Sequence, residues 1–265
     1  MDALVVGKGG GLGRLVCAEL EARGHRIVTE APNVVVNCAG ASVALALGKG
    51  WRGYRAVDTP IGLRAIETAK RHNARLVYIG VHHPPAMRDT AYVDAHERVV
   101  EAMRDVDGCV VRATGFFSAF AAFAPMAKRG FLLDVGDGSA RTNPICEHDL
   151  AEIVVDVALG GDGPRELSAG GPDVMSRREI MEHIAAHANR HARIAGVPVW
   201  LGRMGAFALR CIHPRMGQFA QFAVGLAQND VIAPALGTTR LADYLEQSGR
   251  RARGFELKIR PHGSG

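Results

Sequence analysis

The sequence of 265 residues lacks the features that mark several classes of protein. No apolar run reaches the length of about 18 residues that a transmembrane helix needs, and the start of the chain is too short in apolar residues and too acidic for a secretory signal. The five cysteines form no CxxC pair, which favours reduced thiols in a cytoplasmic protein. Like charges are dispersed except in the tail at 250–253, so we expect no nucleic-acid partner and no membrane.

Glycine, in contrast, is abundant. The chain contains 32 glycines among its 265 residues, about 12% against a usual share of about 7%. Five of them fall within residues 7–13. Hydrophobic residues make up 48% of the chain, which is enough for a large buried core.

The first half of the chain alternates short apolar runs with amphipathic stretches. This alternation predicts parallel βαβ units and a Rossmann-type, doubly wound α/β fold. We expect strands at 3–6, 34–38, 76–79 and 109–112, and helices at 12–23, 60–72 and 91–103. Beyond residue 113 helical patterns dominate, at 116–129, 149–159 and 176–191, followed by an apolar stretch at 200–228. We therefore expect a dinucleotide-binding domain at 1–140 and a small, mainly helical substrate lobe at 141–265, with the chain re-entering the core around 145–170.

A glycine-rich loop follows the first strand. Gly7, Gly10 and Gly13 have the GxxGxxG spacing that permits a tight turn, a close approach to a pyrophosphate and packing of the next helix. The candidate cofactor residues of this loop are Gly7, Lys8, Gly10, Gly11, Leu12, Gly13 and Arg14. The alternative interpretation is that this loop is a glycine-rich turn that binds no ligand.

Charged residues near the loop bear on the choice between the two dinucleotides. Lys8 and Arg14 favour NADP if their side chains contact its 2′-phosphate. The alternative is that both are ordinary solvent-exposed charges. NAD remains possible, and Glu30 is the only acidic candidate for its ribose hydroxyls.

The apolar segment 26–29 is a further candidate strand, but it is followed too closely by the expected strand at 34–38. Four residues separate Thr29 from Val34 and reach roughly 14 Å, whereas a parallel crossover needs a dozen or more residues. We expect that the usual third strand and its helix are missing; a four-residue hairpin is the alternative.

Several motifs together resemble the atypical, NmrA-like branch of the short-chain dehydrogenase/reductases. They are the glycine loop and the segments 37–40, 76–80, 92–97, 111–117, 136–145 and 149–151. The chain also resembles the ketoreductases of angucyclinone-type aromatic polyketide pathways. The resemblance implies a cofactor held further by Asn37, Ala39 and Gly40 near the adenine ribose, Gly80 and Val81 beside the nicotinamide, and Thr114, Gly115 and Phe116 at its carboxamide.

The catalytic set departs from that of the family. Tyr92 matches the proton-donating tyrosine, but His96 occupies the position of the lysine that lowers its pKa, and Gly80 and Val81 stand where the serine is expected. Tyr92 and His96 are the candidate catalytic residues, and packing within a helix is the alternative for Tyr92.

The substrate would meet residues from outside the core. His82 follows the third expected strand and is a candidate to polarise a carbonyl, although Pro84 and Pro85 also suit a plain turn. Phe207, Phe219 and Phe222 belong to the apolar stretch, which fits either core helices or a mobile lid over a large flat substrate. No spacing predicts a metal site.

The sequence therefore predicts an NAD(P)H-dependent ketoreductase acting on a bulky, aromatic, polyketide-type metabolite. A phenol of the substrate could supply the proton if Tyr92 does not. A non-catalytic NAD(P)-binding regulator of the NmrA type is the main alternative, and an isomerase or dehydratase is a further one. The oligomeric state is not predicted.

Overall fold

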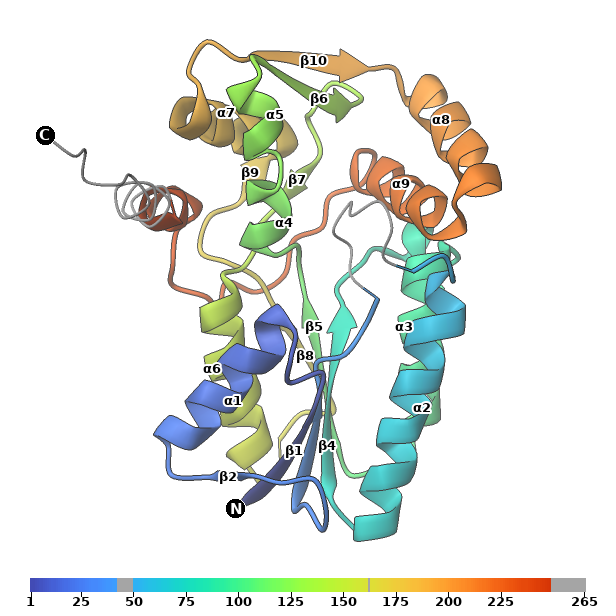
Figure 1. The fold of residues 1–265 in the computed structure, drawn as a ribbon, viewed down its shortest axis with the longest axis vertical. Coiled ribbons are helices and arrows are strands. Elements are labelled where there is room, and N and C mark those ends of the chain that lie inside the picture. Colours follow the sequence, from blue (N-terminus) through green and yellow to red (C-terminus); the bar gives the residue numbers. More distant parts are fainter. Residues whose placement is uncertain (42–49, 162, 249–265) are drawn as a thin grey trace, which may run out of the picture.

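A six-stranded parallel sheet forms the core of the computed structural model, which describes residues 1–41, 50–161 and 163–248. The strand order is β2-β1-β3-β4-β5-β8, and every pair is parallel (Figure 1). The strands are β1 (Asp2–Val6), β2 (Arg26–Ile27), β3 (Val34–Asn37), β4 (Arg75–Val81), β5 (Gly108–Ala113) and β8 (Glu166–Ala169). The predicted Rossmann-type α/β fold is confirmed.

Helices cover both faces of this sheet. They are α1 (Gly11–Ala22) and α6 (Glu147–Leu159) on one face, and α2 (Tyr54–His72) and α3 (Ala91–Ala102) on the other (Figure 1). Alternate residues of β1 point to opposite faces: Val5 joins the α1 and α6 side of the core, and Leu4 joins the α2 and α3 side. The sheet is thus buried on both sides, which explains its nearly continuous apolar strands.

The expected deletion is confirmed. β2 and β3 do not pair with each other; both lie parallel to β1, on opposite sides of it. β2 has only two residues, which pair with the first residues of β1. The segment 28–33 therefore has only to cross β1, at the end of the sheet where β1 and β3 begin. The hairpin alternative is excluded, because a hairpin would pair β2 with β3 in antiparallel fashion.

Helix α2 begins earlier than its sequence indicates. We expect its start at Pro60, yet it starts at Tyr54, whose backbone N–H donates to the Gln218 side chain (3.0 Å). This tertiary contact satisfies a free N–H group at the helix start, and Pro60 lies inside the helix.

The smaller part of the molecule lies beyond the carboxyl edge of the sheet. It contains the two-stranded sheets β10–β6 and β7–β9 and several helices (Figure 1). Its elements are α4 (Phe117–Ala121), α5 (Ala124–Lys128), β6 (Phe131–Val135), β7 (Arg141–Thr142), β9 (Met175–Ser176), α7 (Arg177–Ala188), β10 (Arg193–Val197), α8 (Val199–Ile212) and α9 (Pro214–Leu226). A short 3-10 turn, η1 (Pro85–Met87), follows β4.

The chain passes between the two parts more than once. β6 belongs to the smaller part, whereas α6 and β8 return to the large sheet. Buried Asn143 ties the parts together: its side chain donates to the carbonyls of Gly171 and Ala233, and its carbonyl accepts from the Thr114 hydroxyl. No helix among the described residues combines the length and apolar character that a bilayer crossing requires.

Candidate functional site

The glycine loop connects β1 to α1 at the carboxyl edge of the large sheet. Gly7 has φ +86°, a left-handed conformation that glycine adopts without strain. A Cβ atom on Gly13 would lie 2.1 Å from the Gly7 carbonyl oxygen, so α1 can begin this close to the loop only with glycine there. Gly10 is the N-cap residue of α1, and among the described residues no side chain accepts a hydrogen bond from the N–H groups of the first turn. The first N–H groups of the helix are therefore available to an anion.

The side chains of the loop differ in their surroundings. Leu12 is buried in the core with Val5 and Val16, so only its backbone can meet a ligand. The side chains of Lys8 and Arg14 are both exposed. These two cations are the positive side chains within the glycine loop and the first turn of α1.

The segment after β3 lies against this loop. A Cβ atom on Gly7 would be 2.8 Å from the Cα of Ala39, so the two segments are in backbone contact. Buried Asn37 accepts a hydrogen bond from the Ala39 N–H (3.0 Å), but its Nδ2 has no protein partner among the described residues. An unpaired buried donor is costly. Asn37 thus presents a free N–H beside the loop.

Tyr92 lies on α3 inside an aromatic cluster. Its ring packs against Tyr54 (centroids 4.8 Å apart), His96 (5.0 Å) and Phe222 (4.6 Å). Burial, with a smaller effect of the Asp58 carboxylate, raises the pKa of Tyr92 above its usual value. Tyr92 therefore stays protonated but is a weak acid.

His96 is buried one helical turn after Tyr92. Its Nδ1 lies 2.9 Å from the Tyr78 hydroxyl of β4, and its Nε2 lies 3.8 Å from Oδ2 of Asp58 on α2. Burial lowers the pKa of His96 to about 4, so the imidazole is neutral at neutral pH. His96 consequently does not supply the positive charge that the family's lysine would supply beside Tyr92.

Asp58 is the residue of this cluster that the sequence analysis missed. One of its oxygens accepts from the Ala41 N–H (2.6 Å), while Oδ2 has no hydrogen-bond partner among the described residues. Burial raises its pKa to about 6. A signal was present: Asp58 follows Tyr54 and precedes Gly62 at a spacing of four residues, and all three are buried on one face of α2. An acidic residue in a buried stripe is unusual and marks a candidate functional group.

The two histidines after β4 are held by the protein. His82 contacts the Ser168 hydroxyl through Nδ1 (3.1 Å) and donates through Nε2 to the Ile232 carbonyl (2.9 Å). Both ring nitrogens are thus engaged, which favours a structural role over binding of a substrate carbonyl. His83 lies 3.4 Å from Glu97, which also pairs with Arg112. Burial alone would raise the pKa of Glu97, but His83 and Arg112 bring it down to about 2.

The remaining candidate cofactor residues cluster at the ends of β3, β4 and β5. Gly40 lies next to the Asp58 carboxylate, and Gly80 and Val81 are buried at the end of β4. The hydroxyl of Thr114 donates to the Asn143 carbonyl (2.7 Å), so it already has an acceptor. A Cβ atom on Gly115 would lie 2.9 Å from the Phe120 ring, and Phe116 is half-buried beside it.

The three candidate substrate phenylalanines occupy different surroundings. Phe222 and Phe219 of α9 belong to a cluster with Tyr92, Met87 and Val93. Phe207 of α8 is 66% exposed. Because α9 lies between α8 and α3 (Figure 1), Phe207 is separated from Tyr92, and the apolar stretch divides into one packed helix and one exposed helix.

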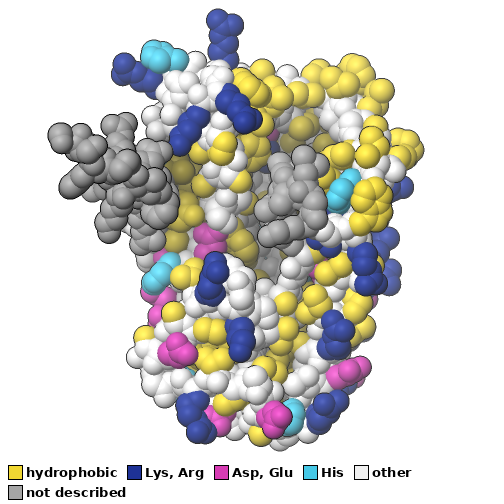
Figure 2. Space-filling model, viewed as in Figure 1, with side chains coloured by type: hydrophobic (Ala, Val, Ile, Leu, Met, Phe, Trp, Pro, Cys, Tyr) yellow, Lys and Arg dark blue, Asp and Glu magenta, His cyan; other side chains and the backbone are white. Residues whose placement is uncertain are grey.

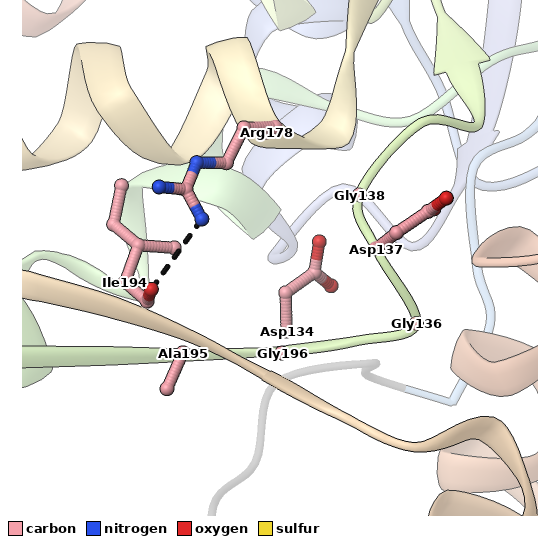
Figure 3. Close-up of a pocket in the computed structure, with 8 residues that line it drawn as sticks. All are labelled: Asp134, Gly136, Asp137, Gly138, Arg178, Ile194, Ala195 and Gly196. Carbon is pink, nitrogen blue, oxygen red and sulfur yellow. Dashed lines mark hydrogen bonds between the residues drawn. The ribbon is translucent and has the colours of Figure 1, made fainter.

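Described residues of the smaller part line a cavity and a groove. One, of about 190 Å³, is formed by the turn 136–138, β10 and Arg178, whose guanidinium donates to the Ile194 carbonyl (Figure 3). Its Asp134 carboxylate is paired with buried Arg177. The other, of about 360 Å³, is a groove between α8 and α9 lined by Arg203, Phe207 and Arg210 among others. Within the described residues, no three His, Cys, Asp or Glu side chains are grouped to hold a metal ion.

Many solved structures are similar to this chain. By sequence, no family model and no curated protein matches it. A human epimerase family protein solved with NADPH has a TM-score of 0.72 at 16% identity, covering 94% of this chain and 99% of that one. An NADPH-dependent quinone oxidoreductase from Escherichia coli has a TM-score of 0.69 at 14% identity, with the same coverage. A GDP-6-OMe-4-keto-L-xylo-heptose reductase from C. jejuni has a TM-score of 0.66 at 12% identity, covering 96% and 98%. The fold is therefore that of NAD(P)-dependent reductases and epimerases.

Proposed function

We propose that this protein is an NADPH-dependent oxidoreductase that reduces a ketone of a bulky, aromatic, polyketide-type metabolite. The observation that carries the proposal is the carboxyl edge of the large sheet. There the uncapped start of α1 lies near two buried polar atoms that have no hydrogen-bond partner among the described residues, Nδ2 of Asn37 and Oδ2 of Asp58. A dinucleotide offers phosphates to the helix start and ribose hydroxyls to such atoms.

NADP suits this edge better than NAD. An NAD site uses an acidic residue just after the second strand, at the level of the glycine loop. Here β2 ends at Ile27, and the connection returns to the start of β1, where the Asn33 N–H donates to the Asp2 carbonyl. Glu30 lies within that connection, beyond the end of β2. Lys8 and Arg14 remain to pair with a 2′-phosphate.

The residues around the reacting atoms offer little acid catalysis. When bound, the cofactor supplies a hydride to the substrate carbonyl carbon. Tyr92 is protonated, but its raised pKa and the neutral state of His96 make it a weak donor. We infer that a phenol next to the ketone of the substrate provides the proton. Tyr92, Phe219 and Phe222 then position the ring system and exclude water.

The replacement Tyr92→Phe tests this assignment. NADPH oxidation is measured with aromatic ketones that carry an adjacent phenol and with matched ketones that lack it. We expect the phenolic ketones to be reduced faster, and Tyr92→Phe to lower their kcat by less than about tenfold. A loss of a hundredfold or more, the usual effect of removing a general acid, would contradict the substrate-assisted route.

A dinucleotide-binding regulator is the second candidate. The neutral His96 in place of a cation favours it, because a sensor needs no acid catalyst. Micromolar or tighter NADPH binding combined with no hydride transfer to any ketone or quinone in the panel would establish this alternative over the reductase.

A further inference from the structure

Asp58 is a buried acidic residue with one unused acceptor atom. It is only 2% exposed, and its Oδ1 accepts a hydrogen bond from the Ala41 N–H (2.6 Å). Its Oδ2 has no hydrogen-bond partner among the described residues. This oxygen lies 3.8 Å from Nε2 of His96, and a Cβ atom placed on Gly40 would be 3.7 Å from it. The oxygen is therefore located between α3 and the turn that follows β3.

Most of the groups that face Asp58 are uncharged. On α3 the imidazole of His96 is neutral at neutral pH, because burial lowers its pKa to about 4. Arg215 on α9 is a positive group that acts on Asp58, but its effect on the pKa of Asp58 is smaller than those of burial and of the Ala41 N–H. The negative charge of the ionised carboxyl is therefore only weakly offset. Three tyrosines on α2, β4 and α3 stay protonated because burial raises their pKa, namely Tyr54, Tyr78 and Tyr92.

The strand order indicates which half of a dinucleotide would meet Asp58. β1, which leads into the glycine loop, has β2 on one side and β3, β4 and β5 on the other. A dinucleotide has its pyrophosphate at such a loop, and residues after the second strand bind its adenosine ribose. The nicotinamide half then lies on the side of β3 and β4. Asp58 is on this side, because its neighbour His96 is hydrogen-bonded to Tyr78 of β4.

We propose that Asp58 makes this site prefer the oxidised cofactor, NADP⁺, to NADPH. The inference rests on the proposed function, because it requires a dinucleotide at this edge of the sheet. The nicotinamide ring is positively charged in NADP⁺ and uncharged in NADPH, so a buried carboxylate attracts only the oxidised form. Surroundings of low dielectric constant strengthen this attraction.

Charges on the surface do not provide the same discrimination. Figure 2 shows exposed Lys, Arg, Asp and Glu side chains dispersed over the part of the molecule that contains the large sheet. Both signs occur together there, and solvent and salt screen exposed charges. The buried carboxylate of Asp58 is screened much less.

The same charge favours release of the hydride. In the proposed reduction the substrate carbonyl carbon takes the hydride, the carbonyl oxygen takes the proton of the phenol, and the nicotinamide ring becomes positive. Ionised Asp58 stabilises that state relative to the state before transfer. A lysine at the position of His96 would act in the opposite direction, because a cation repels the positive ring. The chain has therefore reversed the sign of the charge at this position of the site.

The ratio of the dissociation constants of NADPH and NADP⁺ tests the proposal, measured by titration calorimetry from pH 5.5 to pH 8. Both cofactors have the same 2′-phosphate, whose own pKa is near 6, so its titration cancels in the ratio. Because the pKa of Asp58 is about 6, the preference for NADP⁺ should increase about threefold over this range. At pH 8 Asp58→Asn should reduce the preference about tenfold, whereas at pH 5.5 the variant should approach wild type.

Asp89→Asn, at an exposed aspartate, is the matched control and should keep the wild-type ratio at each pH. A wild-type ratio that does not change between pH 5.5 and pH 8 would overturn the proposal, and this result does not depend on how well any variant folds. An equal preference in Asp58→Asn and wild type at pH 8 would overturn it as well. In both cases the cofactors still bind, so the dinucleotide site remains. Failure of both cofactors to bind would instead overturn the proposed function and this inference with it.

Discussion

The glycine loop and the buried cluster of Asp58, His96 and Tyr78 lie at the same edge of the sheet but are built differently. The loop offers backbone N–H groups, and its shape depends on glycines that are neighbours in the sequence. The cluster consists of three side chains from α2, α3 and β4. The loop retains the features expected for phosphate binding, whereas in the cluster a neutral imidazole and a buried carboxyl stand where a cation is expected.

This difference separates cofactor binding from proton transfer. Backbone groups at a helix start have a fixed partial charge that does not depend on pH. The cluster titrates: burial raises the pKa of Asp58 to about 6 and lowers that of His96 to about 4. Substitutions in the loop should therefore change the affinity for the dinucleotide at every pH. Substitutions in the cluster should have effects that depend on pH.

The largest effect should come from Gly13→Ala. Its Cβ would lie 2.1 Å from the Gly7 carbonyl oxygen, so the start of α1 must move away from the loop. We expect NADPH affinity to fall on the order of a thousandfold, measured by fluorescence titration, with a loss of about 1–3 kcal/mol in unfolding free energy from overpacking.

Gly11→Ala is the matched control for stability. No atom lies within 4 Å of a Cβ placed there, and the position is helical, so the Tm should stay the same or rise. A Gly13→Ala variant as stable as Gly11→Ala and with unchanged affinity would show that the close approach is unimportant.

Asp58→Asn should change the pH dependence of stability. The folded pKa of Asp58, about 6, lies above its unfolded value of 3.8, so its contribution to stability is full below about pH 4 and is lost as pH rises through 6. The variant should therefore gain stability relative to wild type between pH 4 and 6, by up to about 3 kcal/mol. Urea unfolding at several pH values measures this.

His96→Gln supplies the opposite comparison. The folded pKa of His96 lies below its unfolded value, so its contribution to stability is full above about pH 6.5 and is lost as pH falls through 4. His96→Gln should gain relative stability toward acid, and Asp89→Asn, at an exposed aspartate, should follow wild type. Parallel curves for Asp58→Asn and Asp89→Asn would rule out a titrating Asp58.

The smallest effect should come from Arg14→Ala. Its exposed guanidinium would contribute one pairing to a 2′-phosphate, so NADPH affinity should fall about tenfold while NADH affinity stays unchanged. Arg71→Ala, an exposed arginine at the end of α2, is the matched control. An equal loss for both dinucleotides would indicate that Arg14 does not distinguish them.

Features that depend on neighbouring residues were predictable. The strand, glycine loop and helix at 2–22 could be identified because apolar periodicity and glycine spacing are local. The missing strand was predictable because chain length limits a crossover. Asp58 was not found, because its meeting with His96 and Tyr78 requires α2, α3 and β4 to be packed together.

The sequence by itself determined the parallel sheet, its shortened edge and the phosphate-binding loop, since these follow from periodicity, glycine stereochemistry and chain reach. Only the tertiary structure decided which of two similar apolar helices is buried: α9 packs Phe222 against Tyr92, while α8 presents Trp200 and Met204 to solvent. It also decided the charge of the cluster. Burial of Asp58 and His96 depends on elements distant in the chain, and burial sets which of the two holds a proton.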